Sequence, residues 1–258
     1  MIRFDGVTRK YGTKVAVDNL TLHVPAGELF AFLGPNGAGK TTAIKMLAGL
    51  LQATSGKVTV CGHDAGTHTR EATRFIGFVP EEAFLYDKLS GREFLEFIAD
   101  MRGLTAAEKA ARIDRQIDVF ELGEFFDDLT ETYSHGMRQR LVFSAALLHD
   151  PPVLVVDEPM VGLDPKSTRL VKDLLRAKTA AGGTVFMSTH TLSIAEEIAD
   201  RIGIIDRGRL GFLGTLGALR EALAGQEHSL EHLFLELTKA NGDGRAPEPH
   251  PAEPDPAK

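Results

Sequence analysis

The chain has 258 residues, of which 43% are hydrophobic and 25% are charged, a composition typical of a globular protein with a sizeable core. Its 29 basic and 36 acidic residues leave a net charge of −7, which argues against a general nucleic-acid binder. A single cysteine, Cys61, excludes an intrachain disulfide framework and fits a reducing compartment. No apolar run reaches the roughly 20 residues of a membrane span, and the charged N-terminus is unlike a signal peptide, so any membrane role is expected to come through a partner.

Strand and helix signals alternate along the chain, which predicts an α/β fold with a mainly parallel sheet. Residues 2–24 have the pattern of strands joined by a turn after Tyr11. Three short apolar runs, at residues 29–33, 153–156 and 184–187, are typical of strands buried on both faces. Since ligands bind at the carboxyl ends of such strands, the polar residues that follow these runs are expected to converge on one site.

The middle of the chain has a different pattern. Apolar residues recur at helical spacing in residues 94–101 and 113–120, so we interpret residues 82–149 as a helical insertion into the α/β core. Residues 84–86 precede a predicted helix N-cap at Ser90 and are expected to lie in a loop, partly exposed. The last segment, residues 241–258, holds five of the 12 prolines and is expected to be disordered, because it cannot bury enough apolar surface.

The most specific motif follows the first apolar run and matches G-x-x-x-x-G-K-[ST]; it reads Gly34-Pro35-Asn36-Gly37-Ala38-Gly39-Lys40-Thr41. The alternative is a Gly-rich turn without a ligand, but a buried strand precedes the motif and a helix is predicted after it, at residues 41–51. Glycines let backbone N–H groups point inward, and with the helix N-terminus these donors can hold phosphates. Lys40 would reach the β- and γ-phosphates and Thr41 would bind Mg²⁺, so the motif predicts a nucleotide site.

Two carboxylates, Asp157 and Glu158, come directly after the second apolar run. Burying them is costly unless a cation or a hydrogen-bond network compensates. A Mg²⁺ ion bound with the nucleotide would provide that cation, so Asp157 suits a metal contact. Glu158 could accept a proton from an attacking water molecule. The alternative is that both are ordinary surface residues at the end of a strand.

These motifs, and others that follow in a fixed order, resemble the ATP-binding subunit of ABC transporters over residues 2–240. Residues 133–140, Tyr-Ser-His-Gly-Met-Arg-Gln-Arg, are similar to the signature motif, and residues 162–164, Gly-Leu-Asp, are similar to the D-loop. His190 resembles the switch histidine, and Tyr11 stands where the family stacks an aromatic ring on adenine. The resemblance implies a P-loop NTPase core with a mainly parallel sheet, an antiparallel β N-terminal subdomain and an inserted α-helical subdomain.

The resemblance also implies that two subunits dimerise head to tail and hold two ATP molecules between them. The phosphate loop, extended to Thr42, would face the partner's signature, where Ser134, Gly136 and Asp164 would complete the ATP site. A small hydroxyl and free N–H groups at a helix start can hold a γ-phosphate, although taken alone this stretch would be an ordinary helix N-cap. His190 would contact the γ-phosphate and position the attacking water, although a lone histidine after a strand is more often structural.

The sequence departs from the family's pattern in two places. His135 and Met137 stand where the usual signature has a glycine and a glutamine, a variant that resembles the ATPases of small bacterial exporters and of drug-efflux systems. Glu81 stands where the family has the glutamine of its Q-loop. A carboxylate there can still contact Mg²⁺, so the expected metal contacts are Thr41, Glu81 and Asp157.

The partners expected from the resemblance are a separate membrane permease and a second ATPase subunit, in a homodimer or heterodimer at the cytoplasmic face of the cell membrane. Nucleic acid is not expected. The loop after Glu81 and the helix at residues 94–101 would face the permease; the alternative is a self-contained helical subdomain. The signature variant and residues 233–237 resemble exporter ATPases, which favours export over import.

Three other functions share part of this pattern. A soluble ATPase of the same family acting on ribosomes usually carries two cassettes, and a DNA-repair type carries long coiled coils; this sequence has one cassette and no heptad run. A small-molecule kinase would share the phosphate loop but has no need of residues 133–140 or of His190 in this order. A regulatory or resistance ATPase that acts on a soluble partner stays open.

Overall fold

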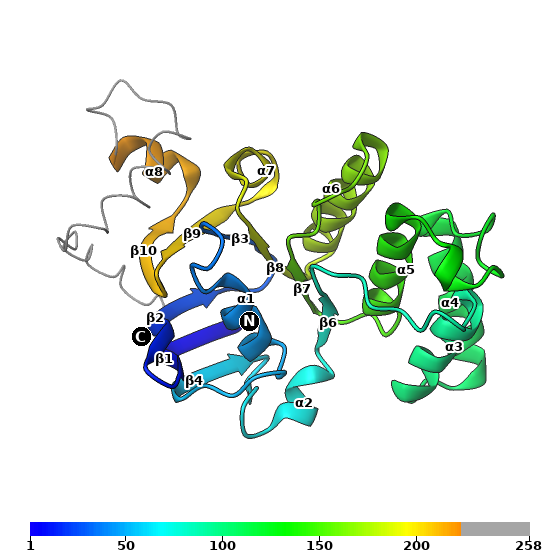
Figure 1. The fold of residues 1–258 in the computed structure, drawn as a ribbon, viewed down its shortest axis with the longest axis horizontal. Helices are drawn as coiled ribbons and strands as arrows, with labels where there is room; N and C mark the ends of the chain where they lie inside the picture. The colour runs from blue at the N-terminus through cyan, green and yellow to red at the C-terminus, as the bar shows by residue number, and fades with distance from the viewer. Residues whose placement is uncertain (223–258) are drawn as a thin grey trace.

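The computed structural model describes residues 1–222; the expected domain end at residue 240, the Pro-rich segment at 241–258 and the exporter-like residues 233–237 lie outside this range. The described chain forms two sheets and a group of helices (Figure 1). In chain order its elements are β1 (Ile2–Tyr11), β2 (Lys14–Val24), β3 (Leu29–Leu33), α1 (Lys40–Leu47), β4 (Ser55–Val60), β5 (His63–Asp64), α2 (Thr69–Thr73), β6 (Ile76–Val79), α3 (Gly91–Met101), α4 (Ala106–Phe120), the 3₁₀ helix η1 (Thr130–Thr132), α5 (His135–Leu147), β7 (Val153–Asp157), α6 (Pro165–Ala180), β8 (Thr184–Thr189), α7 (Leu192–Ile198), β9 (Arg201–Asp206), β10 (Arg209–Gly214) and α8 (Leu216–Ala222).

The first sheet is antiparallel and has the strand order β2-β1-β4-β5. Its first two strands form the predicted hairpin, in which Tyr11 pairs with Lys14 next to the turn. Gly12, in the turn, has a φ of 58°, a conformation that glycine adopts without steric cost. The hairpin therefore leaves Tyr11 at the end of the sheet, 48% exposed.

The second sheet has the order β10-β9-β3-β8-β7-β6, and only the edge strand β10 runs antiparallel to its neighbour. The three apolar runs of the sequence form the adjacent strands β3, β8 and β7, and every residue of these strands is buried. In the parallel register Leu33 pairs with Thr189, and Asp157 pairs with Ser188. The three strands therefore end at the same edge of the sheet, which confirms the predicted fold class and brings their polar ends together.

The two faces of the second sheet contribute to different cores. Phe30 and Phe32 on β3 face the antiparallel sheet and α1, whereas Leu29 and Ala31 belong to the core beneath the helices. Phe186 on β8 packs centrally in the first core, with its ring centroid 5.3 Å from Phe30 and 5.6 Å from Phe32. Truncating a buried phenylalanine to alanine usually costs about 3–5 kcal/mol, so this aromatic cluster holds the two sheets together.

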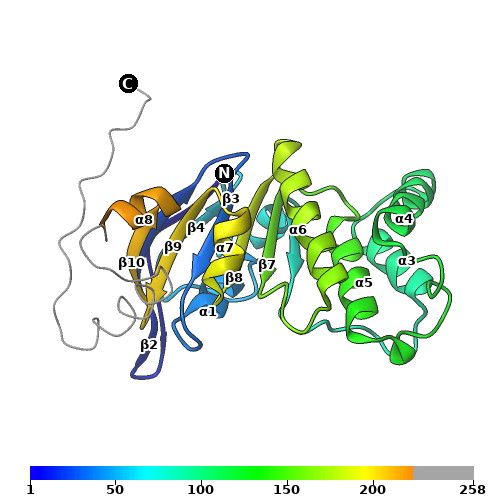
Figure 2. The same ribbon diagram turned by 90° about the horizontal axis from the view of Figure 1, so that it is seen from above.

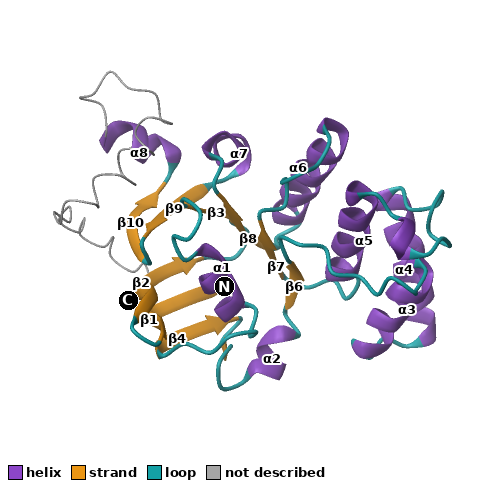
Figure 3. Cartoon of the chain, viewed as in Figure 1, coloured by secondary structure: helices purple, strands orange, loops and turns teal. Residues whose placement is uncertain are grey.

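Helices α3, α4 and α5 gather at the end of the molecule away from the antiparallel sheet (Figures 2 and 3). The predicted N-cap at Ser90 is present as a capping box, in which Ser90 accepts from Glu93 N and the Glu93 carboxylate accepts from Ser90 N. This arrangement is the helical subdomain of the expected fold class. Across residues 1–222, every helix falls short of the length and apolarity that crossing a bilayer would need.

The structure corrects two local expectations. Helix α1 ends at Leu47 and not at residue 51, because Gly49 turns the chain with a φ of 71° and Leu50 N–H then donates back to Lys45 O at 2.8 Å. Leu85 was expected to be partly exposed but is buried at 5%, because it packs into the core under the helices. Its neighbours Phe84 and Tyr86 are exposed, as predicted.

His149 follows α5 and lies in a mostly buried position next to β6. One ring nitrogen, Nε2, is 3.2 Å from the carbonyl oxygen of Ile76, and the other has no partner among the described residues. Burial, together with the nearby positive charges of Arg102, Arg112 and Lys178, lowers the pKa of His149 from its usual 6.5 to about 4. The neutral ring with a proton on Nε2 is therefore the form that fits this position.

We expect acid to destabilise the fold through this histidine. Unfolded, His149 binds a proton near pH 6.5, whereas the folded state resists protonation down to about pH 4, so stability falls as the pH drops between these values. Between pH 7 and pH 4.5 the loss is expected to be about 2–3 kcal/mol of unfolding free energy. Urea unfolding of wild type and His149→Gln at both pH values measures it; equal slopes against pH would contradict the prediction.

Candidate nucleotide-binding site

The phosphate loop lies between β3 and α1, at the edge where the three central strands end. Gly37 and Gly39 have φ values of 81° and 112°, and a Cβ on Gly39 would lie 2.5 Å from the carbonyl oxygen of Ala16. A Cβ on Gly34 would lie 2.3 Å from the carbonyl oxygen of Ile205. Only glycine therefore fits at positions 34 and 39, because backbone from β2 and β9 closes around the loop there.

The first turn of α1 is suited to an anion. Its N-cap is Gly39, and no side chain caps the helix. The N–H groups of this first turn, which have no partner within the helix, and the positive end of the helix dipole both face the phosphate loop. Thr41 and Thr42 lie in this turn, both partly buried, while Asn36 is exposed at the loop's tip. Pro35 and Ala38 complete the loop, and Ala38 N–H donates to Pro35 O at 3.2 Å.

A support for the loop that sequence reasoning missed comes from the turn between β9 and β10. Gly208 N–H donates to the carbonyl of Ala38 at 2.8 Å, and Asp18 N–H donates to the carbonyl of Gly208 at 2.8 Å. Arg209 forms an ion pair with the Asp18 carboxylate at 2.8 Å. Gly208 itself has a φ of 82°. The dipeptide Arg207-Gly208 indicates a turn, but nothing near it in the sequence shows that this turn lies against the phosphate loop.

Lys40 joins the phosphate loop to the carboxylates at the end of β7. Its Nζ donates to the carbonyl of Gly34 at 2.6 Å and lies 3.3 Å from Glu158 Oε1. Both side chains are only 7% exposed. A buried charge is unfavourable without an opposite charge beside it, so removing either Lys40 or Glu158 would leave the other without compensation. The structure thus brings together two residues that the sequence separates by 118 positions.

Glu158 is held on both sides. Its Oε1 faces Lys40, while its Oε2 is 3.0 Å from His190 Nδ1 and accepts from His190 N–H at 3.3 Å. His190 follows directly after β8 and its side chain is 46% exposed, so the ring stands between the buried carboxylate and solvent. The backbone of Glu158 has a φ of 46°, in the left-handed region that favours glycine. This turn of the backbone places the Glu158 carboxylate between Lys40 and His190.

Asp157, the last residue of β7, is 2% exposed. The Ser188 hydroxyl donates to Asp157 Oδ1 in a close contact, and among the described residues no hydrogen bond engages the second carboxylate oxygen. The pairing of β6 with β7 ends at Val79 and Val156, and Glu81 follows two residues later in the loop after β6. Its side chain is exposed. In the described part of the chain, no hydrogen bond or ion pair joins Glu81 to Asp157 or to the phosphate loop.

Within residues 1–222 no group of three or more His, Cys, Asp and Glu side chains is arranged to hold a metal ion. The buried Asp157 with one uncommitted oxygen nevertheless fits Mg²⁺, which prefers oxygen ligands and usually takes one or two carboxylates together with phosphates and water. A magnesium site here would therefore be completed by the nucleotide.

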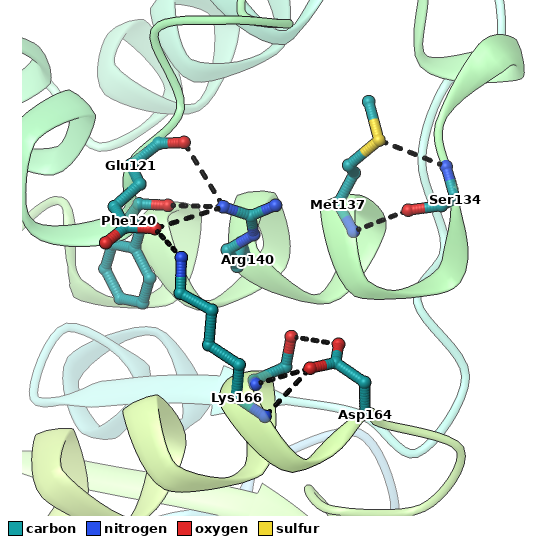
Figure 4. A network of polar contacts seen from close by, with 8 residues as sticks. Phe120, Glu121, Ser134, Met137, Arg140, Asp164 and Lys166 are labelled. Atoms are coloured by element: carbon teal, nitrogen blue, oxygen red, sulfur yellow. Dashed lines mark hydrogen bonds and ion pairs between the residues drawn. The ribbon is translucent and has the colours of Figure 1, made fainter.

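The signature residues form the start of α5, away from the phosphate loop. Ser134 is the N-cap, accepting from Met137 N–H at 3.3 Å, and its own N–H is 3.4 Å from Met137 Sδ (Figure 4). Met137 thus replaces the usual polar partner of a capping box with a weak sulfur acceptor. Across residues 1–222, no hydrogen bond or ion pair joins residues 133–140 to the phosphate loop of the same chain. Figures 1 and 2 place α5 and α1 in different parts of the molecule.

The D-loop lies next to the signature. Asp164 caps α6 by accepting from Lys166 N at 2.9 Å and Ser167 N at 3.0 Å, and the Ser167 hydroxyl holds the pKa of this carboxyl below its usual range. A Cβ on Gly136 would lie 3.7 Å from Asp164 Oδ2, so these two residues, both expected to complete the ATP site, are neighbours. His135 Nε2 lies 3.1 Å from the carbonyl oxygen of Val161, a second tie between the motifs.

A polar network connects this region to the helical subdomain (Figure 4). Lys166 on α6 pairs with Glu121, the residue that ends α4, at 2.9 Å. Arg140 on α5 donates to the carbonyls of Phe120 and Glu121 at 3.3 and 3.2 Å and lies over the Phe125 ring. These contacts join the C-terminal end of α4 to α5 and to the first turn of α6, so the signature and the D-loop are positioned by one set of helices.

Tyr11 is the least constrained of the predicted residues. The Arg9 guanidinium lies over its ring at 4.6 Å from the centroid. Its pairing partner Lys14 is two residues from Ala16, whose carbonyl packs on Gly39. Tyr11 therefore lies near the phosphate loop, because its partner strand β2 runs from Lys14 toward that loop. Its ring is exposed and accessible to a ligand.

Comparison with known proteins fits this geometry. The family model described as "ABC transporter" matches residues 17–161. The daunorubicin/doxorubicin resistance ATP-binding protein DrrA of Streptomyces peucetius is 41% identical over 86% of this chain and 67% of its own. The Nod factor export ATP-binding protein I of Burkholderia thailandensis is 38% identical over 81% of this chain and 68% of its own.

Solved structures agree as well. A structure described as the ATP-binding subunit of an ABC transporter superposes with a TM-score of 0.85 at 30% identity, covering 92% of this chain and 99% of the other. The dimeric post-hydrolysis state of the ATP-binding cassette MJ0796, bound to ADP and Pi, gives a TM-score of 0.76 at 26% identity over 84% and 99%. With its phosphate loop, paired carboxylates and signature helix, the chain belongs to the ABC transporter family as one of its ATP-binding subunits.

Proposed function

We propose that the chain binds Mg²⁺-ATP at residues 34–42 and hydrolyses it with Glu158 as general base, in a head-to-tail dimer that powers export through a membrane permease. The observation that carries this proposal is the meeting of Lys40, Glu158 and His190 at the end of the phosphate loop. Glu158, a carboxylate that can act as a base, lies within contact distance of both a phosphate-binding cation and an imidazole. A cation on the γ-phosphate and a base for the attacking water are the groups that P-loop hydrolysis uses.

Without nucleotide, Lys40 is the partner of Glu158. A γ-phosphate in the loop carries more negative charge than one carboxylate and would take over the lysine. Glu158 would then keep only His190 as a partner, and its Oε1 would be free to accept a proton from water. Nucleotide binding would in this way create the general base, because the same lysine cannot hold both anions at full strength.

Magnesium would be held by the Thr41 hydroxyl and Asp157, with the nucleotide's phosphate oxygens completing its shell. When bound, it would neutralise charge on the phosphates. Glu81 was predicted as a third contact; its exposed position at the start of a loop means that it would have to move toward the site. Tyr11 would stack on adenine, and Arg9 would keep its ring in place.

The dimer is supported by the separation of the signature from the phosphate loop within one chain, since α5 and α1 lie in different parts of the molecule. Ser134, Gly136 and Asp164 would therefore act on the nucleotide of a second copy. The structure of MJ0796 bound to ADP and Pi is dimeric, which supports this arrangement. Two complete sets of motifs would then make two equivalent sites, as a homodimer requires.

A groove of about 330 Å³ between α3, α5 and the start of β6 would receive the permease. Phe84, 81% exposed, and Leu50, 64% exposed, lie at its edge, and Arg102 lines it. Large exposed apolar side chains around a groove are typical of a docking surface. Export is supported by the names of the relatives, a drug-resistance and a Nod factor export ATP-binding protein. The chain would then work at the cytoplasmic face of the membrane, with no nucleic acid.

Glu158→Gln is expected to retain ATP affinity within about threefold and to lower the turnover number on the order of 10²- to 10⁴-fold, because the amide cannot accept the proton. ATP should then accumulate a dimer, seen by size-exclusion chromatography with light scattering. Lys40→Ala is the control that should lose tight ATP binding. Normal turnover in Glu158→Gln would show that Glu158 is not the base.

The buried pair gives a second test, made without nucleotide. Lys40→Met leaves Glu158 buried beside His190 alone and is expected to lower the unfolding free energy by about 3–5 kcal/mol. The double variant Lys40→Met/Glu158→Gln removes both charges and should lose clearly less. Urea unfolding of the four proteins closes the cycle. A double variant as unstable as Lys40→Met would contradict the pairing.

Docking is tested by capture of membrane proteins on the immobilised Glu158→Gln variant with Mg²⁺-ATP, from detergent-solubilised membranes of the native host. We expect a polytopic membrane protein in roughly equal amount, and a loss of at least about tenfold when Phe84 and Leu50 are changed to alanine. Val119→Ala, an exposed apolar residue on α4 outside the groove, is the matched control. Recovery of soluble proteins alone would instead favour a regulatory ATPase.

A further inference from the structure

One polar side chain in the centre of the second sheet touches both carboxylate residues of the site. Ser188 lies on β8 and is completely buried. Its hydroxyl donates to Asp157 Oδ1 and accepts from the backbone N–H of Glu158 at 3.1 Å. A buried hydroxyl is costly unless it is hydrogen-bonded, and this one uses both its proton and a lone pair on neighbouring residues of the site.

The two bonds depend on each other. A hydroxyl has a single proton, so when Ser188 donates it to Asp157 it can only accept from Glu158 N–H. The charged carboxylate cannot donate and the N–H cannot accept, which makes this the only consistent arrangement. Ser188 therefore ties one oxygen of Asp157 to β8 and leaves the other oxygen uncommitted, on the residue that would contact the metal.

The bond to Glu158 falls where the backbone is strained. Glu158 has a φ of 46° and precedes Pro159, a position at which few non-glycine residues are found in the left-handed region. Its N–H is shared between the carbonyl of Ser188 at 3.3 Å and the Ser188 hydroxyl at 3.1 Å. Its carbonyl accepts from Val161 N–H at 3.2 Å. The hydroxyl thus anchors the N-terminal side of the turn that directs the carboxylate toward Lys40.

We propose that Ser188 is a positioning residue for ATP hydrolysis, whose single hydroxyl sets the orientation of Asp157 and of Glu158 relative to each other. The proposal rests on the functions proposed above for these two acids. Ser188 and His190 lie two residues apart on one strand end, and each holds a different part of Glu158, the backbone N–H and the carboxylate. Ser188 acts only through its neighbours and does not touch ATP.

The test compares Ser188→Ala, which removes the hydroxyl without adding volume, with Ser188→Thr, which keeps it. Binding of a fluorescent ATP analogue is measured in EDTA and across a Mg²⁺ titration, and turnover is measured beside it. Ser188→Ala should bind the analogue as wild type does in EDTA, but the Mg²⁺ concentration for half-saturation should rise about 10-fold and turnover should fall about 10- to 100-fold. Ser188→Thr should restore both to within about threefold of wild type.

Ser144→Ala is the matched control. Ser144 is also completely buried, and its hydroxyl bonds only to the carbonyl of Arg140 in its own helix at 2.8 Å. Its variant should keep the wild-type Mg²⁺ half-saturation. In an Asp157→Asn background, Ser188→Ala should add little to the Mg²⁺ shift, since the residue it positions for the metal is already altered.

An unchanged Mg²⁺ half-saturation in Ser188→Ala would overturn the proposal, even if its melting temperature and turnover fell, because lost packing lowers the folded fraction without changing metal affinity. Full additivity of the shifts in the Asp157→Asn background would overturn it too. Failure of the proposed function would look different: wild type would then bind no ATP analogue, or Glu158→Gln would turn over normally.

Discussion

The buried ion pair between Lys40 and Glu158 is the interaction on which the site depends. Its two side chains are 7% exposed and come from separate elements, so the pair joins the phosphate loop to the end of β7. A buried charge without its partner is strongly unfavourable, which forces the loop, the carboxylates and His190 into one position. In the proposed function this pair separates when nucleotide binds, because an incoming phosphate would compete with Glu158 for the lysine. Stability without nucleotide and reactivity with it would therefore come from one contact.

The two halves of the proposed ATP site are held in place by different kinds of contact. The phosphate loop is closed in by backbone from β2 and β9, which leaves no room for a Cβ at Gly34 or Gly39. The signature is fixed by Arg140, Glu121 and Lys166, which join three helices, and by the burial of residues 141–143 of α5 in the core beneath the helices. Exposed ion pairs such as the one between Lys166 and Glu121 are individually weak, so the apolar packing of α5 carries most of this support.

The sequence predicted those features that depend on neighbouring residues. The three apolar runs became adjacent buried strands, the phosphate loop matched a local pattern, and Ser134 and Ser90 capped helices where they were expected to. The features that escaped prediction arise from contacts across the fold. Nothing near Ser188 in the sequence shows that its hydroxyl meets Asp157, 31 residues away, and nothing near Gly208 points to the phosphate loop. Leu85 was misjudged because its burial depends on helices that come later in the chain.

The strand order determines when, during synthesis, the phosphate loop gains its neighbouring strands. β3, which leads into the phosphate loop, lies between β8 and β9, and the turn that supports the loop is at Gly208. A nascent chain that has just exposed the glycine-rich motif lacks both neighbouring strands and this support, which follow more than 140 residues later. Such distant pairings form slowly. The proposed ability to hold a nucleotide would thus be acquired only after β8, β9 and Gly208 have been synthesised, so a chain that stops before them would have little capacity to consume ATP.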